Sequence, residues 1–194
     1  IYSQIGDHLG ISDGDLNWFE AAQLIVSALC IPLLARLADL IGHKKVLLLS
    51  TAITALGSCI IAFAPSFTTF LIWWAIKGAY VVWLPIEVTM IHRLSAGSGR
   101  QGLLTRRSAA ILVGVLEVSV IIAALSSGAL VETLSMPALL SIPAVVVTLC
   151  FALIWFGIAD LPPTSTGRLD VVGFVRITAA ISLVMAGLIA IRLE

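Results

Sequence analysis

The chain has 194 residues, of which 60% are hydrophobic and 11% are charged, and its formal net charge at pH 7 is +0. Soluble domains carry about 25% charged residues, so this composition, with a mean hydropathy of +1.11, excludes an ordinary soluble domain. It predicts an all-α membrane protein whose main partner is the lipid bilayer.

Apolar runs long enough to cross a membrane recur along the chain. A membrane-spanning helix needs about 20 apolar residues, and short polar or turn-forming stretches separate the runs. This length predicts about six transmembrane helices. The predicted spans are Trp18–Leu37, Val46–Ala64, Thr69–Ile91, Ala109–Val131, Met136–Ile158 and Val171–Ile191.

Basic residues are confined to alternate connections between these spans. The connections after the first, third and fifth spans hold Lys44, Arg106 and Arg168, whereas the intervening ones, 64–67 and 132–135, hold no Lys or Arg. Positively charged connections stay on the cytoplasmic side of a membrane. The pattern therefore predicts a multi-pass protein of the cell membrane, with Lys44, Arg106 and Arg168 in the cytoplasm.

The longest polar connection, Leu94–Ser108, is predicted to be a cytoplasmic loop that lies on the lipid surface. Its arginines also suit a nucleic-acid partner, but its position between two spans argues against one. The three cysteines lie inside apolar runs and the three histidines are scattered. The sequence therefore predicts no metal site, no cofactor and no enzymatic activity.

A short polar turn, Ala35–Lys45, joins the first two predicted spans. Gly42 favours the left-handed backbone that ends a helix. Asp39 is expected to accept hydrogen bonds from the free amides that open the next helix. Lys44 is expected to face the anionic inner leaflet.

This turn resembles the signature loop between the second and third spans of the major facilitator superfamily, roughly G-x-L-A-D-R-x-G-R-K. The matching residues are Leu37, Ala38, Asp39, Gly42 and Lys44. Ala35 and Leu40 stand where the pattern has Gly and Arg. The resemblance implies a helical transporter bundle in which Asp39, Gly42 and Lys44 form a gating loop for alternating access.

A second stretch resembles the fourteen-span drug:proton antiporter group of this superfamily. It is the Leu-Pro-Pro and Arg-Leu-Asp-Val-Val-Gly pattern around residues 161–173, and residues 5–12 also resemble that group's segment after span one. The resemblance implies that residues 1–160 form an N-terminal bundle of spans two to six. Residues 161–170 are then a short cytoplasmic linker, and residues 171–194 begin the next span. The second half of the transporter is a further expected partner.

Ionisable residues inside the spans are the candidates for coupling, because each costs about 2.5–3.5 kcal/mol in a membrane. Lys77 and Glu87 lie on the third predicted span and Glu117 on the fourth. A rise of 1.5 Å per residue places Lys77 and Glu117 at similar depths, and we expect them to form an ion pair, with Glu87 toward the cytoplasmic half. Such a pair either couples protons or substrate to transport, or only fixes the register of the two helices.

Aromatic residues accompany these charges on the third span. Lys77, Tyr80 and Glu87 have the spacing of one helical face, and Pro85 is expected to bend the helix. Tyr80 and Trp83 are candidates for lining a pocket for flat or cationic compounds. The alternative is that both aromatic side chains only pack against neighbouring helices.

The sequence thus predicts secondary active transport, namely proton-coupled efflux of a small organic or drug-like compound, as in multidrug-resistance antiporters. Its partners would be the small-molecule substrate and protons. Two alternatives stay open: a solute facilitator or importer without proton coupling, and a membrane sensor or scaffold with the same fold.

Overall fold

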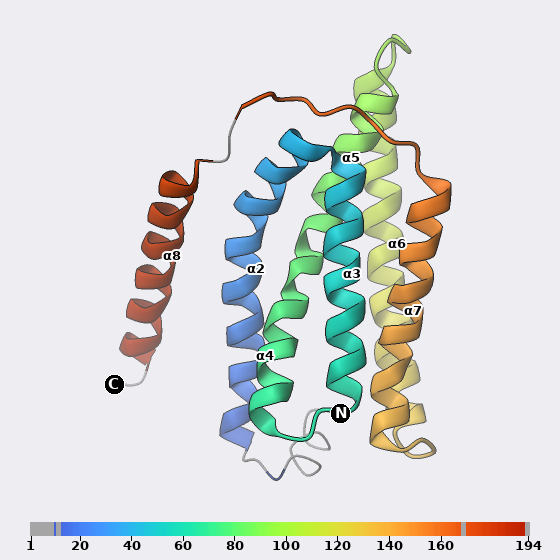
Figure 1. Ribbon diagram of the computed structural model, residues 1–194. Coiled ribbons are helices and arrows are strands. Elements are labelled where there is room, and N and C mark those ends of the chain that lie inside the picture. Colours follow the sequence, from blue (N-terminus) through green and yellow to red (C-terminus); the bar gives the residue numbers. More distant parts are fainter. Residues whose placement is uncertain (1–9, 11–12, 168–169, 193–194) are drawn as a thin grey trace.

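The computed structural model describes residues 10, 13–167 and 170–192, and these residues form helices and connections without a strand. Figure 1 shows the helices running up and down in one bundle. In chain order they are α2 (Asp13–Ile41), α3 (His43–Ala62), α4 (Phe67–Lys77), the 3₁₀ helix η1 (Gly78–Val82), α5 (Trp83–Leu94), α6 (Gln101–Leu130), α7 (Met136–Gly157) and α8 (Val171–Arg192). The expected all-α membrane fold is confirmed.

Five stretches of the described chain are long and apolar enough to cross a membrane, and α4, η1 and α5 together make one of them, Phe67–Leu94. The described part of α8 adds a shorter apolar stretch, Val172–Ile181. The span boundaries agree with the apolar runs of the sequence to within a few residues, except at the start of α6.

The predicted loop Leu94–Ser108 is wrong over its second half. α6 begins at Gln101, so the connection between α5 and α6 is only residues 95–100. Glycines with positive φ, Gly97 at 84° and Gly99 at 68°, make this tight reversal. Two of the three arginines in the stretch, Arg106 and Arg107, instead lie in the second turn of α6, where arginine is a good helix former.

α3 is the central helix of the bundle. It packs against α7, α4, η1 and α2, while α6 packs against α5 and α8 against α2. One core cluster joins α2, α3, η1 and α5 around Leu47 and Val82, and a second joins the other ends of α2, α3 and α4 around Phe19 and Phe70. The Phe19 and Phe70 ring centroids lie 5.0 Å apart. In contrast, α6 has no buried residue.

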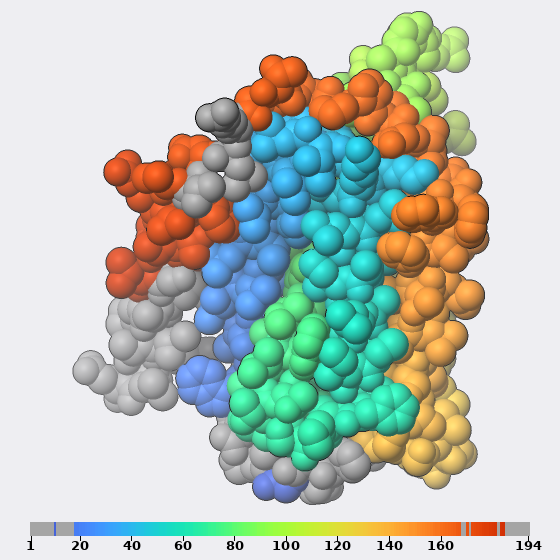
Figure 2. Space-filling view, in the orientation of Figure 1, coloured from blue at the N-terminus to red at the C-terminus, as the bar shows by residue number. Residues whose placement is uncertain are grey.

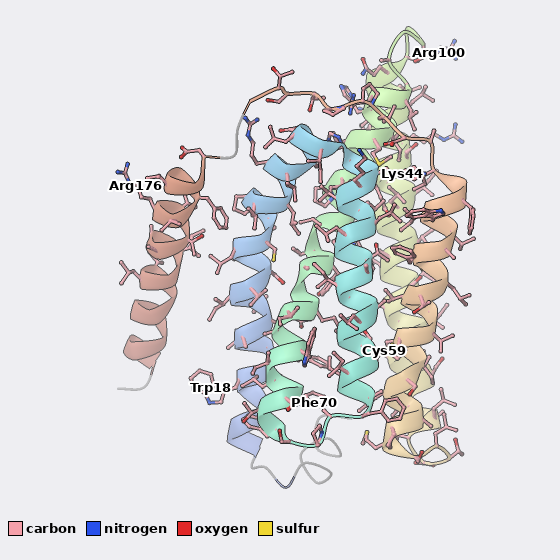
Figure 3. All side chains as sticks on the ribbon, in the orientation of Figure 1. Trp18, Lys44, Cys59, Phe70, Arg100 and Arg176 are labelled. Carbon is pink, nitrogen blue, oxygen red and sulfur yellow. The ribbon has the colours of Figure 1, made fainter. Side chains whose placement is uncertain are left out.

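The linker between α7 and α8 crosses one end of the bundle. Figure 2 shows its orange atoms lying over the blue and cyan ends of α2 and α3. Lys44 and Arg100 both lie toward this end in Figure 3, whereas Trp18, Cys59 and Phe70 lie toward the other. Arg168, the third predicted basic marker, lies outside the described residues. We call the end that bears Lys44 and Arg100 the basic end.

Candidate functional site

The span Phe67–Leu94 is discontinuous at its middle. α4 ends at Lys77, the 3₁₀ turn η1 follows, and α5 begins at Trp83. Pro85 lies in the first turn of α5, where helical N–H groups have no partner within the helix and a proline costs little. The bend expected from Pro85 therefore takes the form of a 3₁₀ segment just before it, and such a segment often marks a hinge.

The break is set by the close approach of α2. The Ser27 hydroxyl of α2 donates a hydrogen bond to the Gly78 carbonyl oxygen at 3.0 Å. A Cβ atom added to Gly78 would lie 2.7 Å from that hydroxyl and 2.9 Å from the carbonyl oxygen of Gln23. Only glycine fits here, because a side chain would collide with the backbone of α2.

Lys77, Tyr80 and Glu87 do not lie on one helical face as predicted, because η1 interrupts the helix between them. A 3₁₀ helix turns 120° per residue and an α-helix 100°, so five 3₁₀ residues rotate the later side chains by about 100°. Lys77 faces the bundle, Tyr80 is 43% exposed, and Glu87 is half-buried on α5.

Lys77 lies in the wall of a cavity of about 400 Å³. Its ammonium nitrogen lies 4.1 Å from the centroid of the Trp74 ring, a cation–π contact. Four helices form the cavity: α3 contributes Ser58, α4 contributes Trp74 and Lys77, α6 contributes Ser127, and α7 contributes Leu139. The cavity lies in the half of the bundle away from the basic end, since Ser58 is in the last turn but one of α3 and Leu139 is in the first turn of α7.

The predicted ion pair between Lys77 and Glu117 is not formed. Glu117 is exposed on α6, and neither residue takes part in an ion pair in the described chain. The physical reason is the direction of the Glu117 side chain, which lies on the exposed face of α6, whereas Ser127 of the same helix lines the cavity with Lys77. Lys77 therefore contacts Trp74 instead.

The two aromatic residues predicted to line a pocket contact each other. Their rings meet edge to face, with centroids 6.0 Å apart. The Trp83 indole nitrogen donates to the Ser50 hydroxyl at 3.1 Å, and Trp83 packs against the core cluster around Leu47. Neither Tyr80 nor Trp83 lines the cavity at Lys77, so the aromatic wall of that cavity comes from Trp74.

The predicted gating loop is a turn of one residue. Gly42, with φ at 106° and ψ at 141°, separates α2 from α3; its φ is positive as expected, but its ψ lies outside the left-handed helical conformation. A Cβ there would also lie 3.3 Å from the Leu161 carbonyl oxygen of the linker. Lys44 donates a hydrogen bond to the Trp155 carbonyl oxygen at 3.0 Å, so it caps the end of α7, where cations are favourable.

Asp39 does not cap α3 as expected, because it is still inside α2 and no side chain caps the amides of α3. Instead it holds the linker. The Thr164 hydroxyl donates to the Asp39 carboxylate at 2.8 Å, and the amides of Thr164 and Ser165 donate to the Asp39 carbonyl oxygen at 3.0 and 3.1 Å. Arg93 at the end of α5 donates to the Pro162 carbonyl oxygen at 2.7 Å.

Two features were missed at the level of sequence. The linker contacts with Asp39 and Arg93 join segments far apart in the chain, and no local pattern signals them. Ser58, in contrast, had a signal: Ser50, Thr54 and Ser58 repeat every four residues within an apolar span, which predicts a polar stripe on one face. All three are buried.

In the described residues, no group of three His, Cys, Asp or Glu side chains is placed to hold a metal ion. No curated protein matches the chain. The family model of the Major Facilitator Superfamily matches residues 1–191. The chain therefore belongs to the Major Facilitator Superfamily, a family of membrane proteins that transport solutes and are not enzymes.

Proposed function

We propose that this chain is part of a secondary active transporter that exports a small organic or drug-like compound in exchange for protons, by alternating access. The observation that carries the proposal is the discontinuous span Phe67–Leu94, with Lys77 at the break and in the wall of a cavity. In secondary transporters, broken helices near the middle of the membrane form substrate and coupling-ion sites. The resemblance to the fourteen-span drug:proton antiporters supports the choice of substrate and direction.

Proton or substrate coupling is assigned to Lys77, Glu87 and Glu117. Charged groups inside a membrane face the bundle interior or a water-filled path. Lys77 meets this condition within the chain, whereas Glu117 is exposed on α6. We propose that the second half of the transporter covers that face of α6 and that Glu117 lines the path between the halves.

The basic end is proposed to face the cytoplasm, in the cell membrane. It combines Lys44 and Arg100 with the linker, and the positive-inside rule favours that side. The hydrogen bonds from the linker to Asp39 then lie on the cytoplasmic surface, where the gating loop Asp39, Gly42 and Lys44 would separate from its partners as access alternates.

Reconstitution of the full-length protein tests the proposal. Proteoliposomes with an internal pH dye are exposed to aromatic cations, neutral aromatic compounds and aromatic carboxylates, and flux of each compound is measured with internal pH. Substrate-dependent proton movement supports proton-coupled export. Flux without proton movement indicates a facilitator, and neither would indicate a sensor or scaffold with this fold.

A Glu117→Gln variant tests the assigned coupling role. We expect its proton-driven transport to fall to the level of empty liposomes, because an amide cannot exchange a proton at this position. Glu132→Gln, which changes an exposed carboxylate in the connection after α6, is the matched control and should transport normally. Undiminished proton-driven transport by Glu117→Gln at normal expression would remove Glu117 from the mechanism.

A further inference from the structure

The wall of the cavity between α3, α4, α6 and α7 contains a buried polar atom without a hydrogen-bond partner. The Ser58 hydroxyl is in its wall, the residue is 2% exposed, and the hydroxyl oxygen has no hydrogen-bond partner. The other hydroxyls of the α3 stripe bond to their own helix, as Thr54 does to the Ser50 carbonyl oxygen at 2.8 Å. Burying a hydroxyl without a hydrogen-bond partner destabilises the folded state. A ligand inside the cavity would supply the partner that Ser58 lacks.

Lys77 lies on the helix that packs against Ser58. A Cβ atom added to Gly57, the residue before Ser58, would lie 3.7 Å from the Lys77 Cβ and 3.4 Å from the Trp73 carbonyl oxygen. The two helices are therefore in close contact at this level. An ammonium group and a free hydroxyl thus enter one cavity from adjoining helices.

The remaining wall is apolar apart from serine hydroxyls. Ser127, on α6, donates to the Ala124 carbonyl oxygen at 2.9 Å, which leaves its oxygen able to accept. The rest of the wall includes Ile61, Trp74, Leu139 and Leu140. Among the described residues that line the cavity, Lys77 is the only charged one, so the electrostatic preference is for an anion.

We propose that this cavity binds an organic carboxylate with an apolar, preferably aromatic body. One carboxylate oxygen accepts a hydrogen bond from the Lys77 ammonium group and the other from the Ser58 hydroxyl, while the body packs against Trp74, Leu139 and Leu140. A volume of about 400 Å³ is within the usual range for small-molecule sites. Charge-assisted hydrogen bonds are about twice as strong as neutral ones, so Lys77 supplies most of the selectivity.

Binding is measured on the full-length protein in nanodiscs by equilibrium dialysis, with empty nanodiscs subtracted. The probes are naphthoate and two relatives of the same shape, the neutral naphthamide and the cationic naphthylmethylammonium. We expect naphthoate to bind at least about tenfold more tightly than either relative. A tenfold ratio of Kd values corresponds to the free energy of one charge-assisted hydrogen bond. Equal or tighter binding of the amide or the cation would overturn the proposal, as would no binding of naphthoate.

Two pairs of variants locate the site. Lys77→Met should weaken naphthoate binding about tenfold and Ser58→Ala about fivefold. The controls Lys45→Met, at an exposed lysine near the basic end, and Ser119→Ala, at an exposed serine of α6, should bind as the wild type does. Ser58→Ala removes a hydroxyl that has no partner in the fold, so it is expected to fold normally even if Lys77→Met does not.

Unchanged binding by Ser58→Ala, or by a folded Lys77→Met, would place the bound carboxylate elsewhere and contradict the assignment. The measurement is independent of transport. A protein that binds naphthoate in this cavity but moves neither substrate nor protons would contradict the proposed function alone.

Discussion

Gly78 is the residue on which the shape of the broken span depends most directly. Its missing side chain lets η1 lie against α2, where Ser27 holds the Gly78 carbonyl oxygen. α4 ends at Lys77, directly before this contact, and the contact therefore sets the position of the Lys77 side chain in the cavity. Backbone geometry, rather than an ion pair, thus places the Lys77 ammonium group in the cavity wall.

Gly78→Ala should destabilise the bundle. The added Cβ would lie 2.9 Å from the Gln23 carbonyl oxygen, and overpacking of this kind costs about 1–3 kcal/mol. The midpoint of thermal unfolding in detergent is the measurement. Gly114→Ala is the control, since a Cβ at Gly114 of α6 meets nothing within 4 Å and the change favours the helix by up to about 1 kcal/mol. A Gly78→Ala protein as stable as the wild type would contradict this account of the break.

At this scale the sequence indicates which residues are unusual for a membrane span, but not which groups their side chains contact. The membrane cost of charge draws attention to Lys77 and Glu117, and the structure places Lys77 in a cavity wall and Glu117 on the exposed face of α6. The predicted ion pair also depends on which face of α6 points into the bundle, and Glu117 lies on the exposed face. Gly42 was predictable because its positive φ follows from a turn confined to so few residues.

Among the elements, the linker between α7 and α8 has the most specific role. It is held to three other segments: Thr164 bonds to Asp39 of α2, Pro162 to Arg93 of α5, and Leu161 lies against Gly42. The turn that resembles the superfamily's signature loop is therefore covered by a segment of the same chain. Any opening of the basic end must first release these contacts.

Thr164→Val should loosen the linker. Valine keeps the shape of threonine but cannot donate to the Asp39 carboxylate, and a lost hydrogen bond is worth about 1 kcal/mol. Hydrogen exchange at the amides of Thr164 and Ser165 should therefore accelerate about fivefold. Thr166→Val, at an exposed threonine without a hydrogen bond in the described structure, should leave the exchange unchanged. Equal protection in both variants would show that the side chain of Thr164 does not hold the linker.

The helices themselves were predictable from the apolar runs, because a membrane span must be about 20 residues long and must form all its backbone hydrogen bonds internally. The start of α6 was not, because Arg106 and Arg107 make the sequence before Ala109 look like a polar connection. Arginine is a good helix former, and helices readily extend past the membrane surface. The 3₁₀ break was only partly predictable: Pro85 indicated a bend, but the location of η1 depends on contact with Ser27.

For the molecule as a whole, the described structure gathers Lys44, Arg100 and the linker at one end of an antiparallel bundle. α6, Gln101–Leu130, is the longest helix of the described chain, and it is long and apolar enough to cross a membrane. Ser98 precedes it at the basic end and Glu132 follows it at the other, and both are exposed. In a transporter bundle with this topology, a bilayer separates these two positions.

Cysteine labelling in intact cells measures this separation most directly. In a variant of the full-length protein with Cys30, Cys59 and Cys150 replaced by serine, Ser98→Cys and Glu132→Cys are each exposed to a membrane-impermeant maleimide. We predict that Glu132→Cys reacts in intact cells and that Ser98→Cys reacts only after the membrane is opened. Labelling of both positions in intact cells, or of Ser98→Cys alone, would contradict a transporter bundle with its basic end in the cytoplasm.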